Sequence, residues 1–154
     1  MRENPYLDAL ELIQSLTAFG IQPSLDGITE LAQWLGNPQL AYSCVQIAGT
    51  NGKTSTARFT AAFLHSQGWK VGLYTSPELV EYRERIELDG KVVSEKIFTD
   101  AVFAAWEASN QAVNAGSIWG VTEFELVTAA ALWFFAQDNS TICSNMESES
   151  SNCL

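Results

Sequence analysis

The sequence predicts an α/β domain built on a parallel sheet, with a phosphate-binding loop after the first strand of that sheet. An apolar stretch, residues 42–48, runs into a glycine-punctuated turn and then into an apolar helical pattern that stops at Gly68. A second apolar segment, residues 70–75, follows and completes a β–loop–α–β unit. Such crossovers are right-handed, so we expect two neighbouring parallel strands. The first strand lacks polar alternation, which predicts burial on both faces.

The loop between the first strand and its helix has the composition of a polyphosphate cradle. Gly49 and Gly52 allow positive φ, so that backbone N–H groups converge on an anion, and the helix N-terminus adds a partial positive charge. The Lys53 ammonium can reach outer phosphates, while Thr54 and Ser55 offer hydroxyls to phosphate or Mg²⁺. The spacing is shorter than in the common Walker A loop. A plain strand-to-helix turn is the alternative, which the flanking strand and helix disfavour.

The second strand ends beside another hydroxyl residue. Ser76 follows residues 70–75, and the carboxyl ends of parallel strands meet at one edge of a sheet, where ligands bind. We therefore expect Ser76 to face the same crevice as the loop. His65, near the end of the loop helix, is more typical of a surface residue favoured by the helix dipole than of a catalytic one.

Composition limits the function classes. The 154 residues suit one domain, and the net charge of −10 argues against nucleic acid as a partner. We expect neither a membrane span, since no apolar run of about 18 residues exists, nor a secretory signal. The three cysteines show no C-x-x-C spacing, which favours a reducing cytoplasm over a disulfide framework or a zinc site. Cys44 is expected to be buried on the first strand.

Helical patterns precede the loop. A helix is expected from Pro5, capped by Asn4 and ended by Gly20, and a second over residues 25–35. Ser24 is the expected cap of the second helix, and residues 36–38 (Gly-Asn-Pro) its stop signal.

A hairpin and two helices follow the second strand. Residues 84–94 alternate around an Asp89-Gly90 turn, and a helix then runs to about residue 115. Thr122 and Glu125 form a capping box before a uniformly apolar helix that must be buried. Residues 138–154 are rich in Ser and Asn, which predicts disorder and the absence of the strand that should follow the apolar helix.

Several ordered motifs together resemble the N-terminal domain of the folylpolyglutamate synthase/dihydrofolate synthase family, in the Mur ligase superfamily. The matching segments are residues 19–21, 35–38, 49–56 (GTNGKTST), 74–77 (YTSP), 84–86 (ERI) and 122–125 (TEFE). The resemblance covers about residues 5–137. It implies a parallel-sheet P-loop domain of Mur ligase type over residues 1–137, incomplete at its C-terminal end, with residues 138–154 as a non-family tail.

The resemblance implies an ATP-dependent amide ligase that adds L-glutamate to a folate or dihydropteroate carboxylate through an acyl phosphate. Its cofactors would be ATP and Mg²⁺, its partners small molecules only, and its full-length form a monomer. Ser76 resembles the family's magnesium-ligating serine, and the Thr54 hydroxyl could also ligate the metal. By similarity the catalytic residue is Lys53, on the outer phosphates, and the phosphates are held by Gly49, Thr50, Asn51, Gly52, Lys53, Thr54 and Ser55.

Three further positions match substrate contacts of the family. Thr122 and Phe124 match positions that hold the pterin ring, with a helix cap and a core aromatic as the alternatives. Arg85 either holds substrate or braces its loop, and bracing is favoured. Glu78 stands where the family usually has histidine, and is expected either to ligate a metal or to face solvent.

The last departure concerns length. Family members are roughly three times as long, and residues 138–154 match none of their later motifs, as in a truncated member whose last residues are foreign or frame-shifted. We expect this chain alone to be inactive as a ligase. A cell-wall Mur ligase and a non-catalytic nucleotide-binding fragment are the alternatives.

Overall fold

The computed structural model describes residues 4–16 and 25–145, which divide into two compact units. One unit comprises residues 1–39 and 95–134 and is called the helical unit here. The other comprises residues 40–94 and 135–154 and is called the sheet unit. Each has its own buried residues and is described by itself.

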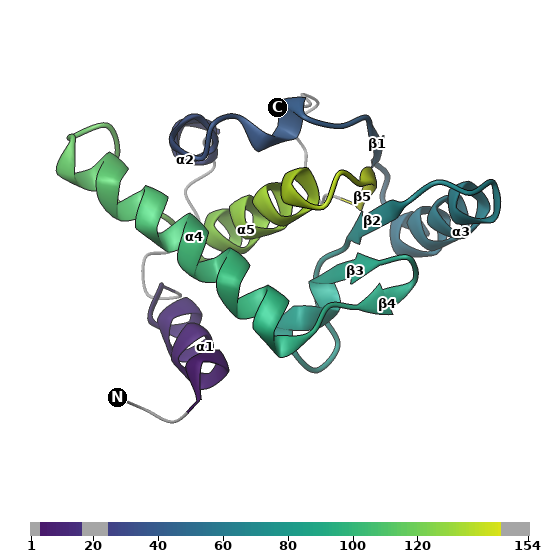
Figure 1. The fold of residues 1–154 in the computed structure, drawn as a ribbon, viewed down its shortest axis with the longest axis horizontal. Coiled ribbons are helices and arrows are strands. Elements are labelled where there is room, and N and C mark those ends of the chain that lie inside the picture. Colours follow the sequence, from purple (N-terminus) through teal and green to yellow (C-terminus); the bar gives the residue numbers. More distant parts are fainter. Residues whose placement is uncertain (1–3, 17–24, 146–154) are drawn as a thin grey trace. The chain divides into compact units, whose positions relative to one another are not determined.

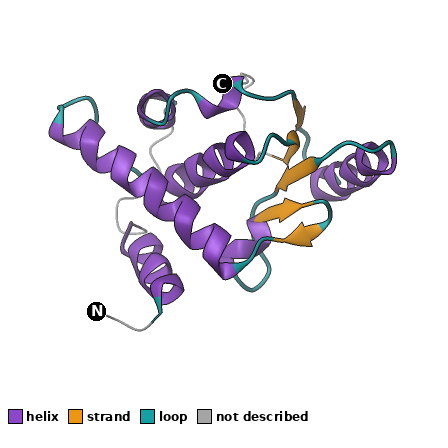
Figure 2. Cartoon of the chain, in the orientation of Figure 1, coloured by secondary structure: helices purple, strands orange, loops and turns teal. Residues whose placement is uncertain are grey.

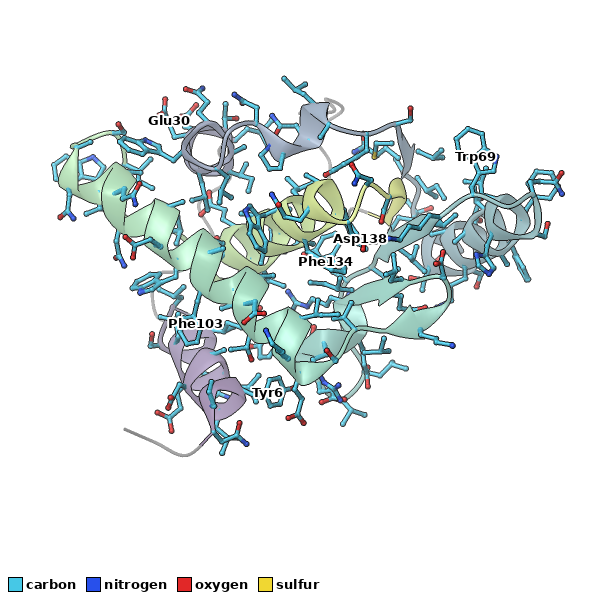
Figure 3. The ribbon with its side chains drawn as sticks, viewed as in Figure 1. Tyr6, Glu30, Trp69, Phe103, Phe134 and Asp138 are labelled. Atoms are coloured by element: carbon cyan, nitrogen blue, oxygen red, sulfur yellow. The ribbon has the colours of Figure 1, made fainter. Side chains whose placement is uncertain are left out.

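The helical unit is organised along its longest helix, α4 (Glu95–Asn114). Helices α1 (Pro5–Leu16) and α2 (Asp26–Trp34) pack against α4, and α5 (Glu123–Gln137) contributes all but its last residues to this unit (Figure 1). The Tyr6 ring meets the Phe98 ring edge-on, with centroids 6.0 Å apart (Figure 3). The unit's buried apolar side chains include Ala9, Ile13, Ile28, Leu31, Phe98, Val102, Ala105, Leu126 and Ala130.

Several predicted helix ends are confirmed. The Asn4 side chain accepts a hydrogen bond from the Tyr6 N–H at 3.0 Å, as an N-cap should. Helix α2 ends where Gly36 and Asn37 take positive φ, and the Asn37 N–H donates to the Ala32 carbonyl at 2.7 Å. The predicted boundary residues Gly20 and Ser24 lie outside the described residues.

The predicted apolar helix is confirmed as α5. Its capping box is present, because the Thr122 N–H donates to Glu125 Oε2 at 2.8 Å and the Glu125 N–H donates to Thr122 Oγ1 at 3.2 Å. Leu126, Val127 and Phe135 are fully buried, as a helix apolar on every side requires. Within the described residues, no helix combines the length and apolarity needed to cross a membrane.

The sheet unit confirms the α/β class with a mixed sheet of order β1-β5-β2-β3-β4 (Figure 2). Its strands are β1 (Cys44–Ile47), β2 (Val71–Tyr74), β3 (Ile86–Leu88), β4 (Lys91–Val92) and β5 (Thr141–Asn145). Helix α3 (Lys53–Ser66) connects β1 to β2. Both strands run parallel to β5, so the predicted parallel crossover is confirmed. They are not neighbours, because β5 lies between them.

Strand β5 corrects the expectation of disorder after Asp138. Residues 141–145 pair with β1 on one side and β2 on the other, so the strand expected to be absent is present. Two ladders satisfy the backbone groups of a central strand, which compensates for a composition poor in apolar residues. The Lys70 ammonium fixes the entry to β5, since Nζ lies 2.8 Å from Asp138 Oδ1 and 2.9 Å from the Asp138 carbonyl (Figure 3). Residues 146–154 lie outside the described residues.

The two faces of β2 differ in what covers them. Val71 and Leu73 pack against Ala57 of α3, with Ala61 and Leu64 nearby. Gly72 points to the opposite face, where an added Cβ would stand 2.4 Å from two ring carbons of Phe135. The ring of Phe135 therefore occupies the space that any side chain at position 72 would need.

Strand β1 is not buried on both faces, and that prediction is wrong. Cys44 and Val45 are exposed, and only Gln46 and Ile47 are partly buried. The reason is topological: β1 is an edge strand that pairs with β5 alone, and α3 packs mainly on β5 and β2. A continuous apolar run in the sequence therefore did not imply a central strand.

The predicted hairpin is confirmed at its turn. Asp89 and Gly90 both take positive φ, 49° and 75°, as a type I′ turn requires. Arg85, expected in the strand, instead ends a 3₁₀ helix, η3 (Tyr82–Arg85). Asp89 Oδ1 accepts the Val71 N–H at 2.8 Å and lies 3.1 Å from Nδ1 of the exposed His65, whose predicted surface position is confirmed.

Candidate functional site

The loop between β1 and α3 has the backbone of an anion cradle. Gly49 and Gly52 take φ of 154° and 75°, which only glycine adopts at little cost. Gly52 is the N-cap of α3 and provides no side-chain cap, and the first intrahelical bond runs from the Thr56 N–H to the Gly52 carbonyl at 2.9 Å. The amides of residues 53–55 thus precede the helical ladder, at the positive end of the helix dipole.

Lys53 adds a full positive charge to this cradle. Its Nζ donates to the Gly49 carbonyl at 2.7 Å, so the ammonium lies over the loop rather than away from it. Convergent amides, one ammonium and the hydroxyls of Thr54 and Ser55 form a donor set suited to a polyphosphate.

Ser76 lies at the same sheet edge as the loop. In the strand register, Ile47 of β1 pairs with Asn145, and Tyr74 of β2 pairs with Ser144. The two strands therefore end almost level on either side of β5, roughly 10 Å apart at about 4.8 Å per strand spacing. The expectation that the glycine loop and Ser76 lie at the same end of the parallel strands is confirmed, although β5 separates the two strands that they follow. Ser76 is only 9% exposed.

Arg85 braces the segment after Ser76. Its Nε donates to Glu78 Oε2, and its guanidinium carbon lies 5.1 Å from the centre of the Tyr82 ring. Its carbonyl accepts the Thr75 N–H at 2.9 Å. The favoured interpretation of Arg85 as a brace agrees with these contacts. Because Glu78 forms an ion pair with Arg85, the expectation that its carboxylate simply faces solvent is wrong.

Thr122 and Phe124 lie in the helical unit, at the start of α5. Thr122 acts as the helix cap described above, one of the alternatives raised for it. Phe124 is 38% exposed, so the alternative of a core aromatic is wrong. The exposed ring remains available for a ligand contact.

One ion pair in the sheet unit, between Arg58 and Glu87, was not predicted from the sequence. Arg58 Nη2 of α3 lies 2.5 Å from Oε1 of Glu87 on β3, and Glu87 is 5% exposed. The sequence does show Glu87 between two apolar residues of the hairpin strand. It does not show that this carboxylate lies on the face of the sheet that α3 covers.

The oxygen atoms that Ser76 and Thr54 could offer to a metal are hydroxyls. In the parts of the chain that the structure describes, no group of three His, Cys, Asp or Glu side chains is placed to hold a metal. Mg²⁺ usually keeps several waters and binds through one or two protein oxygens plus substrate phosphates. The hydroxyls of Ser76 and Thr54 beside a polyphosphate cradle fit that mode.

Known proteins resemble this chain in sequence. No family model matches it. It is 38% identical over 130 residues to a Haloferax volcanii protein named "Probable bifunctional folylpolyglutamate synthase/dihydropteroate synthase", over 84% of this chain and 15% of that one. It is 34% identical over 132 residues to the dihydrofolate synthase/folylpolyglutamate synthase of Bacillus subtilis, over 86% of this chain and 30% of that one.

Solved structures agree. Folylpolyglutamate synthetase from Lactobacillus casei superposes with a TM-score of 0.87 at 31% identity, over 97% of this chain and 37% of that one. The Mycobacterium tuberculosis folylpolyglutamate synthase complexed with ADP superposes with a TM-score of 0.81 at 32% identity, over 92% of this chain and 31% of that one. The chain thus spans between 15% and 37% of the lengths of these four proteins. By sequence and fold it belongs to the folylpolyglutamate synthase/dihydrofolate synthase family, of whose members it represents a part.

Proposed function

We propose that this chain carries the nucleotide-phosphate half of an ATP-dependent ligase site that joins L-glutamate to a folate or dihydropteroate carboxylate. The observation that carries the proposal is the loop of positive-φ glycines that opens α3, at the sheet edge that also holds Ser76. The proposal is supported by relatives named folylpolyglutamate and dihydrofolate synthases and by a structural relative complexed with ADP.

Each part of the loop has a role in this proposal. The amides of residues 49–55 hold the β- and γ-phosphates, and Lys53 leaves the Gly49 carbonyl to neutralise these two outer phosphates, the β-phosphate included when ADP is bound. The hydroxyls of Ser76 and Thr54 would hold Mg²⁺, which would neutralise phosphate charge. Arg85 acts on the site by bracing Glu78 and the loop after Ser76, rather than by direct substrate contact.

The acceptor substrate would be held by the start of α5. The exposed Phe124 ring can stack on a planar heterocycle, and Thr122 fixes the helix end that presents it. When bound, ATP would transfer its γ-phosphoryl group to the acceptor carboxylate with ADP as the leaving group. The glutamate amine would then displace phosphate from this acyl phosphate and lose a proton as the amide forms. The residues of this chain bind and orient phosphate, and none is needed as a nucleophile.

Whether this chain alone can join glutamate to the acceptor is a separate question from whether it binds nucleotide. We propose that the 154-residue chain alone does not complete the ligation, because the residues proposed here, all within the described part of the chain, bind phosphate, metal and the acceptor, and none of them binds glutamate. Glutamate-dependent ADP release by the purified chain would overturn this part of the proposal.

Binding of MgADP to the purified chain tests the site itself. Titration calorimetry should detect MgADP binding by the wild type and at least a roughly tenfold loss in Lys53→Ala, because one ammonium–phosphate contact is removed. Lys91→Ala is the matched control, since Lys91 is an exposed lysine of the same unit on β4. Equal affinities in the two variants would remove Lys53 from the site, and no binding by the wild type would refute the nucleotide proposal for this chain.

A non-catalytic nucleotide-binding fragment is the second candidate. It is favoured by the small share of each relative that the chain spans. The half-site proposal and this second candidate both expect the purified chain to bind MgADP without glutamate-dependent turnover. Turnover by the purified chain would contradict both.

A further inference from the structure

A buried carboxylate on β3 is held by a half-exposed arginine from the phosphate-loop helix. Glu87 is 5% exposed, whereas the Arg58 side chain is 51% exposed, and their atoms approach to 2.5 Å. A carboxylate so far removed from water is costly unless it is paired. The burial of Glu87 in the sheet is therefore tied to the position of α3.

Sheet geometry explains why the two side chains meet. Glu87 pairs directly with Leu73 of β2, and residues opposite each other on paired strands point to the same face. Leu73 packs against Ala57, the residue before Arg58. Glu87 thus lies on the face covered by α3, among apolar neighbours, and Arg58 is the cation that reaches it.

The same short strand region also holds the loop after Ser76. The Arg85 carbonyl, two residues before Glu87, accepts the Thr75 N–H at 2.9 Å, and the Arg85 guanidinium pairs with Glu78. Residues 85–87 therefore contact both elements of the candidate site: α3, whose first turn carries the cradle, and the segment that follows β2.

We propose that Arg58 and Glu87 are a positioning pair, which holds the N-terminal turns of α3 in register with the strand that braces the Ser76 loop. The pair touches no substrate. Its importance for nucleotide binding rests on the proposed function, whereas its mechanical role does not.

Hydrogen exchange of the full chain, without ligand, tests the mechanical role. Glu87→Met removes the buried charge and roughly keeps its volume, and the half-exposed Arg58 that remains can be hydrated, so that no charge is left buried and unpaired. We expect amides of residues 49–58 and 75–80 to exchange roughly tenfold faster, because local opening becomes easier there. Amides of α4 should keep their rates.

Two further variants separate positioning from general stability. Arg58→Met should speed exchange in the same segments, and by more than Glu87→Met, because it leaves the buried Glu87 carboxylate without its cation. Arg58→Lys should keep most of the protection, since a single ammonium keeps the charge but loses the forked geometry. The double variant Arg58→Met/Glu87→Met should exchange no faster than Glu87→Met. Lys96→Met is the matched control, because it breaks an exposed ion pair with Asp100, also at 2.5 Å, in the helical unit.

The hydrogen-exchange results test the positioning role of Arg58 and Glu87 independently of the ligase proposal. Faster exchange confined to residues 49–58 and 75–80 supports the positioning pair; unchanged exchange, or an equal increase throughout both units, overturns it. MgADP affinity is measured in parallel, and Arg58→Met should bind several-fold more weakly than Lys96→Met. If the wild type fails to bind MgADP, the proposed function fails, while the exchange data still support or overturn the positioning role.

Discussion

Replacing Gly72 by alanine should destabilise the sheet unit, although alanine normally strengthens a strand. The added Cβ would lie 2.4 Å from Cδ1 and Cε1 of Phe135 and 3.0 Å from Cζ, all closer than non-bonded carbons approach. Overpacking of this kind costs about 1–3 kcal/mol. The reduced freedom of the unfolded chain returns about 0.4–1 kcal/mol. Because the added Cβ would meet two ring carbons at 2.4 Å, the upper part of the overpacking range, about 2–3 kcal/mol, applies, and the net loss expected for Gly72→Ala is about 1–2 kcal/mol.

Urea denaturation followed by far-UV circular dichroism measures this loss, which corresponds to a lowering of Tm by roughly 2–8 °C. The control is a double-mutant cycle with Phe135→Leu, which removes the ring that the methyl group meets. The double variant should be more stable than the sum of the two single losses predicts. A Gly72→Ala variant as stable as the wild type, or two losses that simply add, would contradict a clash between the added methyl group and the Phe135 ring.

Four further predictions concern single contacts. Thr122→Ala removes the α5 capping box and should cost about 1 kcal/mol in urea unfolding, whereas Thr122→Ser should cost little. Gly52→Ala forces a φ of 75° on a residue with a Cβ and should cost about 1 kcal/mol, and Gly52→Asn should recover part of it because asparagine tolerates this region. Lys70→Met breaks the ion pair with Asp138 and should speed amide exchange in residues 141–145. Global stability should fall by less than about 1 kcal/mol. Unchanged exchange would contradict a role for Lys70 in fixing the start of β5. Burial, with a smaller effect of Cys44, raises the pKa of Tyr42, so the contribution of this phenol to stability should be constant below about pH 10 and be lost as the pH rises further, a loss that Tyr42→Phe should remove.

Local signals in the sequence predicted most elements of the fold. Asn4, the Asp89-Gly90 turn and the Thr122 capping box each specify a backbone geometry through their own side chains or their tolerance of positive φ. The glycine loop and Ser76 were predicted to share an edge because parallel crossovers place strand ends together, and the strand register agrees. These features need no knowledge of distant partners.

The predictions that were wrong concern contacts that only the tertiary structure determines. Residues 141–145 become a central strand because β1 and β2 offer hydrogen-bonding partners on both sides, which composition does not reveal. Cys44 is exposed because its strand lies at the edge, although its apolar run is typical of a central strand. The pairing of Glu78 with Arg85 was missed because a loop brings together residues seven positions apart.

The position of β5 sets an order of events when the chain is made. Cys44 pairs with Ile142, 98 positions later (142 − 44), and β1 pairs with no other strand of the described residues. Contacts so distant in sequence form late, because a long stretch of chain must be closed first. During synthesis, the strand that leads into the glycine loop must therefore wait, with both edges unpaired, until residues 141–145 have left the ribosome.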